Sequence, residues 1–299
     1  PLEHVTRLLQ AAHYNPKVAR LMTPSSGRIK RSWVTYRKRY VEPVRIKQGI
    51  AFWQEHQALL DETAKHYGVP PSVIVAIIGV ETLYGRYTGG FAVLDALATL
   101  GFRNPDPNRP ERSQLFRDQL ADLIELDWTN QLDALNATGS FAGAIGLPQF
   151  MPGSLRRFAA DGDNDSKINL HHSVADAVAS VAQFLRLHGW EPGLPVFASV
   201  TVPANAAEWV DGGLTPKLTW PELEKAGFKA QTQKDSNAWT RYPVGVIDLL
   251  DEPRNLAEYR VATPNFFALT EYNRSYFYAT SVAELANILA DNMGYGRAF

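Results

Sequence analysis

The sequence predicts a mainly α-helical protein of the α+β class, with a small β-rich region inserted between helical ones. Three observations support this fold class. Apolar residues recur at helical spacing through most of residues 1–194, short β-branched runs broken by Pro and Gly replace them over 195–265, and helical spacing returns within 281–299. The length of 299 residues exceeds the size at which one hydrophobic core usually stops growing, so we expect several domains.

The first predicted domain is helical and covers residues 1–65, joined by the C-terminal helix over 281–299. Apolar residues within His4–Tyr67 recur at helical spacing with polar residues between them. The segment Arg28–Lys47 carries eight Lys or Arg and one acid, Glu42. A solvated helix face or a wall for an acidic polymer explains this cluster. Nucleic acid is not an expected partner, because the rest of the chain is net acidic and shows no nucleic-acid motif.

The second predicted domain, over residues 66–194 and 266–280, begins with a helix. Pro70 and Pro71 suit a helix start, because proline at the first helical position gives up only a donor that lacks a partner. The apolar segment from Val73 continues to Tyr84, and this length favours a helix over a buried strand. Further helices are predicted over Leu94–Leu100, Ser113–Leu126 and Val174–His188, with a proline-rich loop over Asn104–Pro110.

Glu81 follows Val73–Val80, a run of eight residues without a charged or strongly polar side chain. A carboxyl group held against apolar walls near the negative end of a helix dipole is disfavoured in its charged form, so its pKa rises. Such a group can donate a proton at neutral pH, which is general-acid chemistry. The alternative is a structural Glu81 in solvent, paired with Arg86.

Two further motifs have the residue types of a sugar cleft. In Ser140–Pro152 (SFAGAIGLPQFMP), small residues let the backbone approach a ligand closely, and Gln149 offers both a donor and an acceptor. In Glu271–Tyr278 (EYNRSYFY), aromatic faces and the Asn273 amide suit an N-acetylated sugar. An aromatic core strand is the alternative explanation for this second motif.

The segment Asp161–Leu170 (DGDNDSKINL) matches the start of an EF-hand calcium loop. Carboxylates stand at positions one, three and five, where oxygen ligands converge on one cation. Ser166 replaces the usual glycine at position six, and His172 stands where the bidentate acid belongs. A stretched loop would bring in Asp176 as the closing ligand, so we predict a bound cation. A solvated acidic turn is the alternative.

The third predicted domain is small and β-rich and covers residues 195–265. Its predicted strands are Val196–Val202, Val244–Leu250 and Glu258–Thr263, which are short, rich in β-branched residues and broken by Pro and Gly. Helical spacing returns at Ser281–Asp291, so the chain is expected to rejoin the helical body after this insertion.

The composition excludes several classes of protein. The chain has no cysteine, which removes disulfides, thiolate metal sites and cysteine nucleophiles. Hydrophobic residues make up 45% and charged residues 20%, which is ordinary globular composition. No apolar run approaches the roughly 18 residues of a membrane span. The N-terminus lacks a signal-peptide pattern and begins with Pro1 rather than Met, so we expect upstream sequence to have been removed, and any export signal or lipid anchor would lie there.

Six ordered motifs resemble those of the membrane-bound lytic murein transglycosylase B family. They are GVETLYGR at 79–86, LDALATLGF at 94–102, GSFAGAIGLPQFMPGS at 139–154, the acidic loop, ADAVASVAQFLRLHGW at 175–190 and EYNRSYFYA at 271–279. The resemblance spans Tyr36 to Ala279. It implies a goose-lysozyme-like helical core with an added helical domain and a small β domain. The implied activity is non-hydrolytic cleavage of the β-1,4 bond from MurNAc to GlcNAc, leaving a 1,6-anhydromuramoyl end.

The resemblance also implies roles for individual residues. Glu81 is similar to the family's single catalytic acid and base. The residues similar to its glycan-cleft residues are Tyr36, Ser140, Gln149, Met151, Tyr272, Asn273 and Tyr278. The residues similar to its calcium ligands are Asp161, Asp163, Asp165, the Lys167 carbonyl and Asp176. In the calcium loop, this chain departs from the family pattern at Asp163, where serine can occur, and in a one-residue longer spacing to Asp176. In the glycan cleft, it departs at Leu115 and Phe184, where tyrosines can occur.

The resulting expectation is an enzyme that acts on peptidoglycan glycan strands, with a structural Ca²⁺ and no organic cofactor. We expect a monomer in the periplasm of a Gram-negative bacterium, with a lipid anchor to the outer membrane as one option. Ordinary glycosidases use two carboxylates, whereas Glu81 is the one acid in a catalytic motif, so an anhydro product is predicted. The alternatives are a hydrolytic muramidase on the same scaffold and a non-catalytic peptidoglycan-binding protein.

Overall fold

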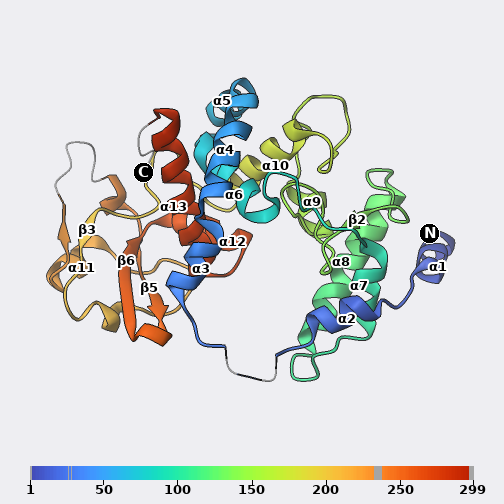
Figure 1. The fold of residues 1–299 in the computed structure, drawn as a ribbon, viewed down its shortest axis with the longest axis horizontal. Helices are drawn as coiled ribbons and strands as arrows, with labels where there is room; N and C mark the ends of the chain where they lie inside the picture. The colour runs from blue at the N-terminus through green and yellow to red at the C-terminus, as the bar shows by residue number, and fades with distance from the viewer. Residues whose placement is uncertain (1, 26, 28, 232–237, 296–299) are drawn as a thin grey trace. The chain divides into compact units, whose positions relative to one another are not determined.

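The structure is a computed structural model that describes residues 2–25, 27, 29–231 and 238–295. Helices dominate this part of the chain, and its strands form short antiparallel pairs (Figure 1). The predicted mainly α fold with a small β-rich part is therefore confirmed. The end of the predicted C-terminal helix, 296–299, lies outside the described residues. Within the described ranges, no helix combines the length and apolar character needed to cross a membrane.

The chain forms two compact units, and each unit is built from two segments. The first unit contains Pro1–Arg28 and Glu81–Gln183, and the second contains Ile29–Val80 and Phe184–Phe299. Helix α6 (Pro71–Thr82) contributes its last two residues to the first unit, and helix α10 (Val174–Leu187) contributes its last four to the second. The three-domain division with boundaries near 65, 194 and 265 stays a prediction.

Two packed helices form the centre of the first unit. These are α7 (Val93–Phe102) and α8 (Glu111–Trp128), which Figure 1 shows side by side in green and which cover the predicted helices 94–100 and 113–126. Helices α1 (Leu2–Ala11) and α9 (Pro152–Phe158) pack on α8, and α2 (Pro16–Met22) packs on α7. A two-residue strand pair, β1 (Phe91–Ala92) with β2 (Thr138–Gly139), precedes the glycine-rich loop.

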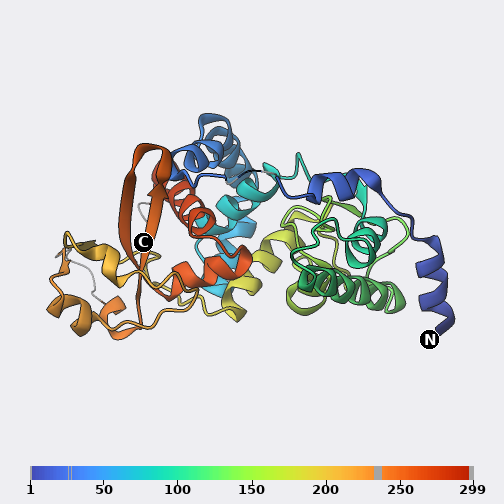
Figure 2. The ribbon, with the colours of Figure 1, turned by 90° about the horizontal axis from the view of Figure 1, so that it is seen from below.

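The second unit is organised around α13 (Tyr276–Met293). This helix packs against α3 (Trp33–Tyr40), α4 (Pro43–Glu55) and α12 (Pro264–Tyr272). Helix α5 (Gln57–Tyr67) follows α4 and ends at Gly68 in the left-handed conformation. Figure 2 shows the hairpin of β5 (Gly245–Asp251) and β6 (Leu256–Ala262), in orange, beside α13, in red.

Side-chain caps explain where several of these helices begin. The Glu42 carboxylate accepts from the N–H groups of Val44 and Arg45 at the start of α4, and Pro43 occupies the first helical position. Ser275 caps α13 by accepting from the Tyr278 N–H. Both caps satisfy donors that have no partner inside the helix.

Two sequence predictions near the C-terminus are corrected. Helix α12 was not predicted, and α13 begins at Tyr276 rather than at Ser281. Thr263 caps α12 through the Asn265 N–H and Pro264 occupies its first position, so the helix starts at the C-terminal edge of the predicted β-rich domain, 195–265. The alternative of an aromatic core strand at 271–278 is wrong, because these residues end α12 and begin α13.

The β-rich part of the second unit has a cluster of buried side chains of its own. Strands β5 and β6 pair from Gly245↔Ala262 to Asp251↔Leu256, where strands were predicted at 244–250 and 258–263. Of the predicted strand 196–202, only β3 (Val200–Thr201) forms, paired with β4 (Lys229–Ala230). The short helices are η1 (Ala206–Trp209), α11 (Trp220–Lys225), η2 (Ala238–Arg241) and η3 (Glu252–Arg254). The buried cluster includes Trp220, Phe228, Trp239 and Val246.

Candidate active site and cation loop

Glu81 is the second-last residue of α6. Residues 71–80, which precede it along the helix, are all buried, and Glu81 itself is half-buried. This location is the carboxyl end of a 12-residue helix, where the unpaired carbonyl groups carry partial negative charge. The structure therefore places Glu81 where the sequence predicted it, at the end of an apolar helix.

The chain turns sharply directly after α6. Leu83, Tyr84 and Gly85 all have left-handed backbone conformations, with φ of 51°, 59° and 84°. Such angles cost roughly 1–2 kcal/mol for a residue with a side chain. Conformations of this kind persist only where surrounding contacts determine them, and they concentrate at functional sites. The turn after Glu81 is therefore held by other parts of the first unit.

Thr82 provides one of these contacts. It is buried, and its hydroxyl donates to the Leu147 carbonyl at 2.9 Å and accepts from the Gly85 N–H at 3.0 Å. The Tyr87 N–H donates to the Thr82 carbonyl at 3.0 Å. One side chain thus fixes the turn after Glu81 and ties it to the glycine-rich loop. Sequence reasoning missed Thr82, although a hydroxyl residue directly after an apolar helix and a catalytic candidate was a usable signal.

The glycine-rich loop is a series of tight turns. Ile145 and Phe150 exchange backbone hydrogen bonds of 2.8 and 3.1 Å around the four residues between them. Within this turn, Gly146 has a φ of +73°, and a Cβ atom there would lie 2.3 Å from the Leu170 carbonyl oxygen. Only glycine fits such a position. Gly146 thus allows close packing against the backbone at Leu170, and the expected approach of this loop to a ligand stays a prediction.

Gln149 links the loop to the chain beyond Glu81. Its side-chain amide donates to the Gly146 carbonyl at 2.9 Å and to the Thr88 carbonyl at 3.1 Å. The two amide hydrogens are thus engaged within the protein, whereas the sequence suggested that they face a sugar. Among the described residues, no donor reaches the Gln149 Oε1 atom. The acceptor half of this amide is therefore the part that a sugar hydroxyl or N–H can use.

Ser140 and Met151 lie at the two ends of the same loop. The Ser140 hydroxyl oxygen accepts from the N–H groups of Ala142 and Ala144, at 3.2 and 3.0 Å. Met151 is half-buried and precedes Pro152, the first residue of α9. Ser140, Gln149 and Met151 are thus presented by one loop, and Thr82 and Gln149 connect that loop to the segment that follows Glu81.

The other predicted glycan residues belong to the second unit. The rings of Tyr272 and Tyr278 are parallel within 11° with centroids 6.4 Å apart, and Phe184 contacts Tyr272 edge-on at 4.9 Å. Asn273 is exposed and terminates α12. Tyr36, on α3, contacts Phe277 at a centroid distance of 5.5 Å. Tyr278 is only 2% exposed, whereas Tyr272 is half-buried, so Tyr272 is the ring of this pair with an accessible side chain.

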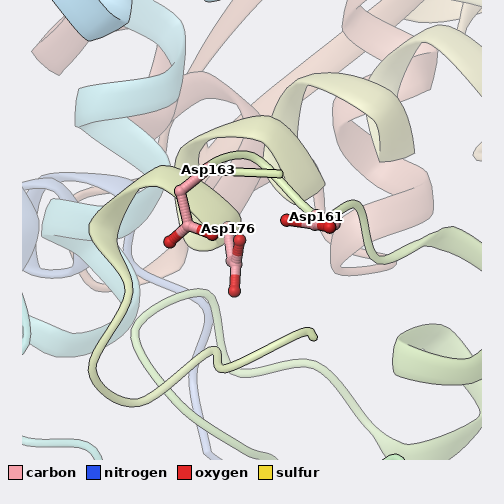
Figure 3. Close-up of side chains that lie close together, drawn as sticks. All are labelled: Asp161, Asp163 and Asp176. Carbon is pink, nitrogen blue, oxygen red and sulfur yellow. The ribbon is translucent and has the colours of Figure 1, made fainter. Parts of the chain in front are cut away.

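The acidic loop brings three of the predicted cation ligands together. Carboxylate oxygens of Asp161, Asp163 and Asp176 lie within 4.8 Å of one another (Figure 3). Asp161 and Asp163 come from the loop, and Asp176 comes from the first turn of α10. Ser166 has a φ of +68°, so it adopts the conformation that the usual glycine supplies at this position. The substitution of serine for glycine is therefore compatible with the EF-hand turn.

Hydrogen bonds shape the loop around these acids. Asp161 accepts from the N–H groups of Asp165 and Ser166, at 3.2 and 2.8 Å. Asp176, which is 1% exposed, accepts from the Gly162 and Asn169 N–H groups through its two oxygens, at 2.8 and 2.7 Å. Three carboxylates held this close repel one another, which a hard divalent cation would relieve. The donor set therefore fits Ca²⁺.

The remaining predicted ligands are Asp165 and the Lys167 carbonyl. Asp165 does not belong to the cluster of three, and its carboxylate accepts from the Lys167 N–H at 2.8 Å. Ser173 was missed by the sequence analysis. Its hydroxyl donates to Asp163 at 2.7 Å and accepts from the Asp176 N–H at 3.2 Å. The spacing Ser-x-x-Asp before an apolar run is a helix-capping signal that could have identified it.

The chain matches the family model described as Transglycosylase SLT domain over residues 2–287. It is 37% identical over 263 residues to the membrane-bound lytic murein transglycosylase B of Escherichia coli (strain K12), a match that covers 87% of this chain and 68% of that protein. The fold is the lysozyme-like fold of the solved Slt35 structures. The chain therefore belongs to the transglycosylase SLT domain family.

Three solved structures illustrate this similarity. Soluble lytic transglycosylase SltB1 from Pseudomonas aeruginosa has a TM-score of 0.84 and 36% identity, covering 98% of this chain and 94% of that one. Escherichia coli Slt35 in complex with calcium has a TM-score of 0.80 and 33% identity, covering 97% and 88%. Pseudomonas aeruginosa SltB3 in complex with NAG-anhNAM-pentapeptide has a TM-score of 0.81 and 27% identity, covering 97% and 74%.

Proposed function

We propose that this chain is a peptidoglycan lytic transglycosylase that cleaves the β-1,4 bond between MurNAc and GlcNAc without water. One observation carries the proposal. In the two segments that Thr82 and Gln149 hold together, 81–88 and 139–151, Glu81 is the single carboxylate. Hydrolytic glycosidases need a second carboxylate to activate water or to attack the sugar. These two segments thus supply an acid but not the second carboxylate that hydrolysis requires.

In the proposed mechanism, Glu81 acts first as acid and then as base. Its position at the carboxyl end of α6 favours the neutral carboxylic acid, because the helix dipole disfavours negative charge there. The protonated Glu81 gives its proton to the glycosidic oxygen as the bond to the muramoyl C1 breaks, and GlcNAc leaves as the alcohol. The carbonyl of the muramoyl 2-acetamido group stabilises the positive charge that develops at C1.

The second half of the reaction closes a ring within the substrate. The muramoyl C6 hydroxyl attacks C1, and the Glu81 carboxylate accepts the hydroxyl proton. Glu81 is thereby returned to its acid form, and the muramoyl unit becomes a 1,6-anhydro sugar. No water is consumed and no proton is lost. The acceptor oxygen of Gln149, the Ser140 hydroxyl and Met151 are proposed to position the glycan in the first unit. Tyr36, Tyr272, Asn273 and Tyr278 are proposed to do so in the second.

The acidic loop is proposed to bind a structural Ca²⁺. Asp161, Asp163 and Asp176 would hold the ion, with Asp165 and the Lys167 carbonyl as the further ligands expected from the sequence. The ion supplies positive charge that offsets the repulsion among the carboxylates. Its support is the clustering of three carboxylates within 4.8 Å and the similarity to Slt35, which was solved in complex with calcium. The proposed substrate would place the enzyme in the periplasm of a Gram-negative bacterium.

Product analysis tests the proposed function directly. Purified peptidoglycan is digested with the enzyme and the fragments are weighed by mass spectrometry. We expect fragments one water lighter than the reducing-end fragments of a muramidase, and no cleavage by Glu81→Gln. Reducing-end products would identify a hydrolytic muramidase instead. Undiminished cleavage by Glu81→Gln would remove Glu81 from the mechanism, and binding without cleavage by the unmodified enzyme would indicate a non-catalytic peptidoglycan-binding protein.

A further inference from the structure

A cavity of about 370 Å³ lies on the second unit, beside the start of α13. Its lining includes Arg31, Leu214, Asp248, Arg274, Tyr276 and Phe277. The volume is at the lower end of the range for small-ligand sites, which suits a few residues of a peptide. None of these residues belongs to the glycan residues or to the cation loop predicted from the sequence.

The walls of this cavity are held in place by hydrogen bonds. The backbone of Arg31 is tied to Glu252 twice: the Arg31 N–H donates to the Glu252 carboxylate at 3.1 Å, and the Glu252 N–H donates to the Arg31 carbonyl at 2.8 Å. The Tyr276 hydroxyl donates to the Gly213 carbonyl. Burial, with the nearby charges of Asp211 and Asp248, raises the pKa of Tyr276 to about 12, so this donor stays protonated. The cavity is therefore a formed site.

The cavity carries two guanidinium groups and one carboxylate. Arg274 is exposed and Asp248 is half-buried. Within the described part of the chain, neither side chain forms an ion pair. Arg31 has only a long contact, 3.6 Å from its Nε to the Glu252 carboxylate. A guanidinium group presents a planar pair of N–H donors that matches a carboxylate. A ligand with carboxylates and one amino group would therefore satisfy all three charges.

The position of Arg274 relates this cavity to the glycan. Arg274 directly follows Tyr272 and Asn273, which are proposed glycan residues, in a turn where the Ser275 N–H donates to the Asn273 carbonyl at 2.6 Å. In peptidoglycan, the stem peptide branches from the muramoyl sugar, so its binding site must adjoin the glycan residues. A stem peptide also has the required chemistry, because it carries free carboxylates and, at its diamino acid, an amine.

We propose that this cavity binds the stem peptide of peptidoglycan, with peptide carboxylates at Arg274 and Arg31 and the diamino-acid amine at Asp248. The inference rests on the proposed function, because it takes a muramoyl peptide as the substrate. It adds a determinant of specificity: the enzyme would prefer glycan whose stem peptides are intact. Glycan stripped of its peptides would be cleaved with a lower kcat/KM.

Activity on two substrates provides the first test. One is glycan that carries stem peptides, and the other is the same glycan after enzymatic removal of the peptides. We expect Arg274→Gln to lower kcat/KM about tenfold on peptide-bearing glycan, as for the loss of one charge-assisted hydrogen bond, and to leave peptide-free glycan unaffected. The control is Arg241→Gln, an exposed arginine of the same unit outside the cavity, which should behave as wild type. An equal effect of Arg274→Gln on both substrates, or none on either, would overturn the proposal.

Binding of the free stem pentapeptide, measured by calorimetry on the full chain, provides a test that does not depend on cleavage. We expect saturable binding that weakens about tenfold in Arg274→Gln. Asp248→Asn should weaken binding of the pentapeptide with a free amine but not of the peptide acetylated at that amine. Absent binding, or binding indifferent to Arg274, would overturn the inference even if the enzyme cleaves glycan. If neither glycan is cleaved, the proposed function fails and this titration alone decides the inference.

Discussion

At the scale of single residues, the side chain that follows Glu81 is central to the site. Thr82 is buried and hydrogen-bonds both to the left-handed turn at Leu83–Gly85 and to the Leu147 carbonyl of the glycine-rich loop. Its hydroxyl therefore holds two segments in register that are far apart in the sequence. If Glu81 must transfer a proton to a glycosidic oxygen, the orientation of its backbone depends on this contact.

Replacing Thr82 by valine keeps the shape of the side chain but removes its hydroxyl. The Leu147 carbonyl and the Gly85 N–H then lose a buried partner, which lowers the free energy of unfolding by about 1–3 kcal/mol. We also expect a lower kcat on peptidoglycan. Thr82→Ser retains the hydroxyl and should recover most of both losses. Urea unfolding and product release from labelled peptidoglycan measure the two effects, and wild-type kcat in Thr82→Val would exclude a positioning role.

His171 makes stability depend on pH. Its Nε2 lies 2.9 Å from the Thr138 carbonyl oxygen, and burial lowers its pKa below the ordinary 6.5. The unfolded chain therefore takes up this proton at a higher pH than the folded one. The contribution of neutral His171 is fully present above pH 6.5 and is lost as pH falls through the window below that value.

We therefore expect the Tm of the wild type to fall more steeply between pH 7 and pH 5 than the Tm of His171→Gln, which keeps a donor for Thr138 but does not titrate. The measurement is a series of melting curves at constant ionic strength. His66→Gln, at an exposed histidine of the other unit, serves as the control and should keep the wild-type slope. Parallel slopes for the wild type and His171→Gln would show that His171 does not titrate in this range.

At the scale of elements, the acidic loop and α10 form one structure, because Asp176 and Ser173 connect the helix start to the loop. Added calcium is expected to raise the Tm by several degrees. An ion at a hundred times its Kd contributes about 2.7 kcal/mol by mass action, and 1 kcal/mol shifts the Tm of a chain of this size by about 2 °C. Melting curves with calcium and with a chelator measure this shift.

Two variants distinguish calcium binding at the acidic loop from a general effect of salt on the Tm. Asp163→Asn removes one charge from the cluster and should abolish most of the calcium-dependent shift. Asp118→Asn, at an exposed acid on α8, should leave the shift unchanged. An unchanged shift in Asp163→Asn would place the ion elsewhere, and a Tm indifferent to calcium would leave the loop as a solvated acidic turn.

At the scale of the whole molecule, each unit is assembled from two chain segments. Helices α1 and α2 pack on α8 and α7, whereas α3 and α4 pack on α13. Residues 1–65 thus contribute to both units and depend in each on helices from later in the chain. A fragment of residues 1–65 is therefore expected to be largely unfolded by circular dichroism, while the full chain is helical. A cooperative melting transition in that fragment would show an autonomous domain.

Much of this fold could be predicted because the relevant signals are local. Long periodic helices such as α6, α7, α8 and α10 and the β5–β6 hairpin follow from spacing and β-branched runs. The acidic loop could be predicted because its carboxylates stand at positions one, three and five of one short segment. The two-residue strands β1, β2 and β4 could not be predicted, because pairs this short leave no periodicity, and β3 was predicted only as part of a longer strand. Helix α12 was not predicted, because the neighbouring aromatic, strand-like run outweighed the helix-start signal of Thr263 and Pro264.

The candidate site was predictable in its parts but not in its connections. Glu81 and the glycine-rich loop stand out in the sequence, yet the hydrogen bonds from Thr82 to Leu147 and from Gln149 to Thr88 join segments 65 and 61 residues apart. No local pattern reports such pairs. For the same reason the sequence suggested that Gln149 offers donors to the sugar, whereas the fold uses them to join its own backbone.

The two oxygens of Asp176 also bear on how the enzyme would behave where calcium is scarce. They accept from Gly162 and Asn169, near the two ends of the acidic loop, so those ends are fastened by the protein itself. Loss of the ion would then loosen the middle of the loop and leave the start of α10 anchored. If the proposed ion binds there, its removal would change the rigidity of the loop gradually, and helix α6, which carries Glu81, would keep its fold in a medium depleted of divalent cations.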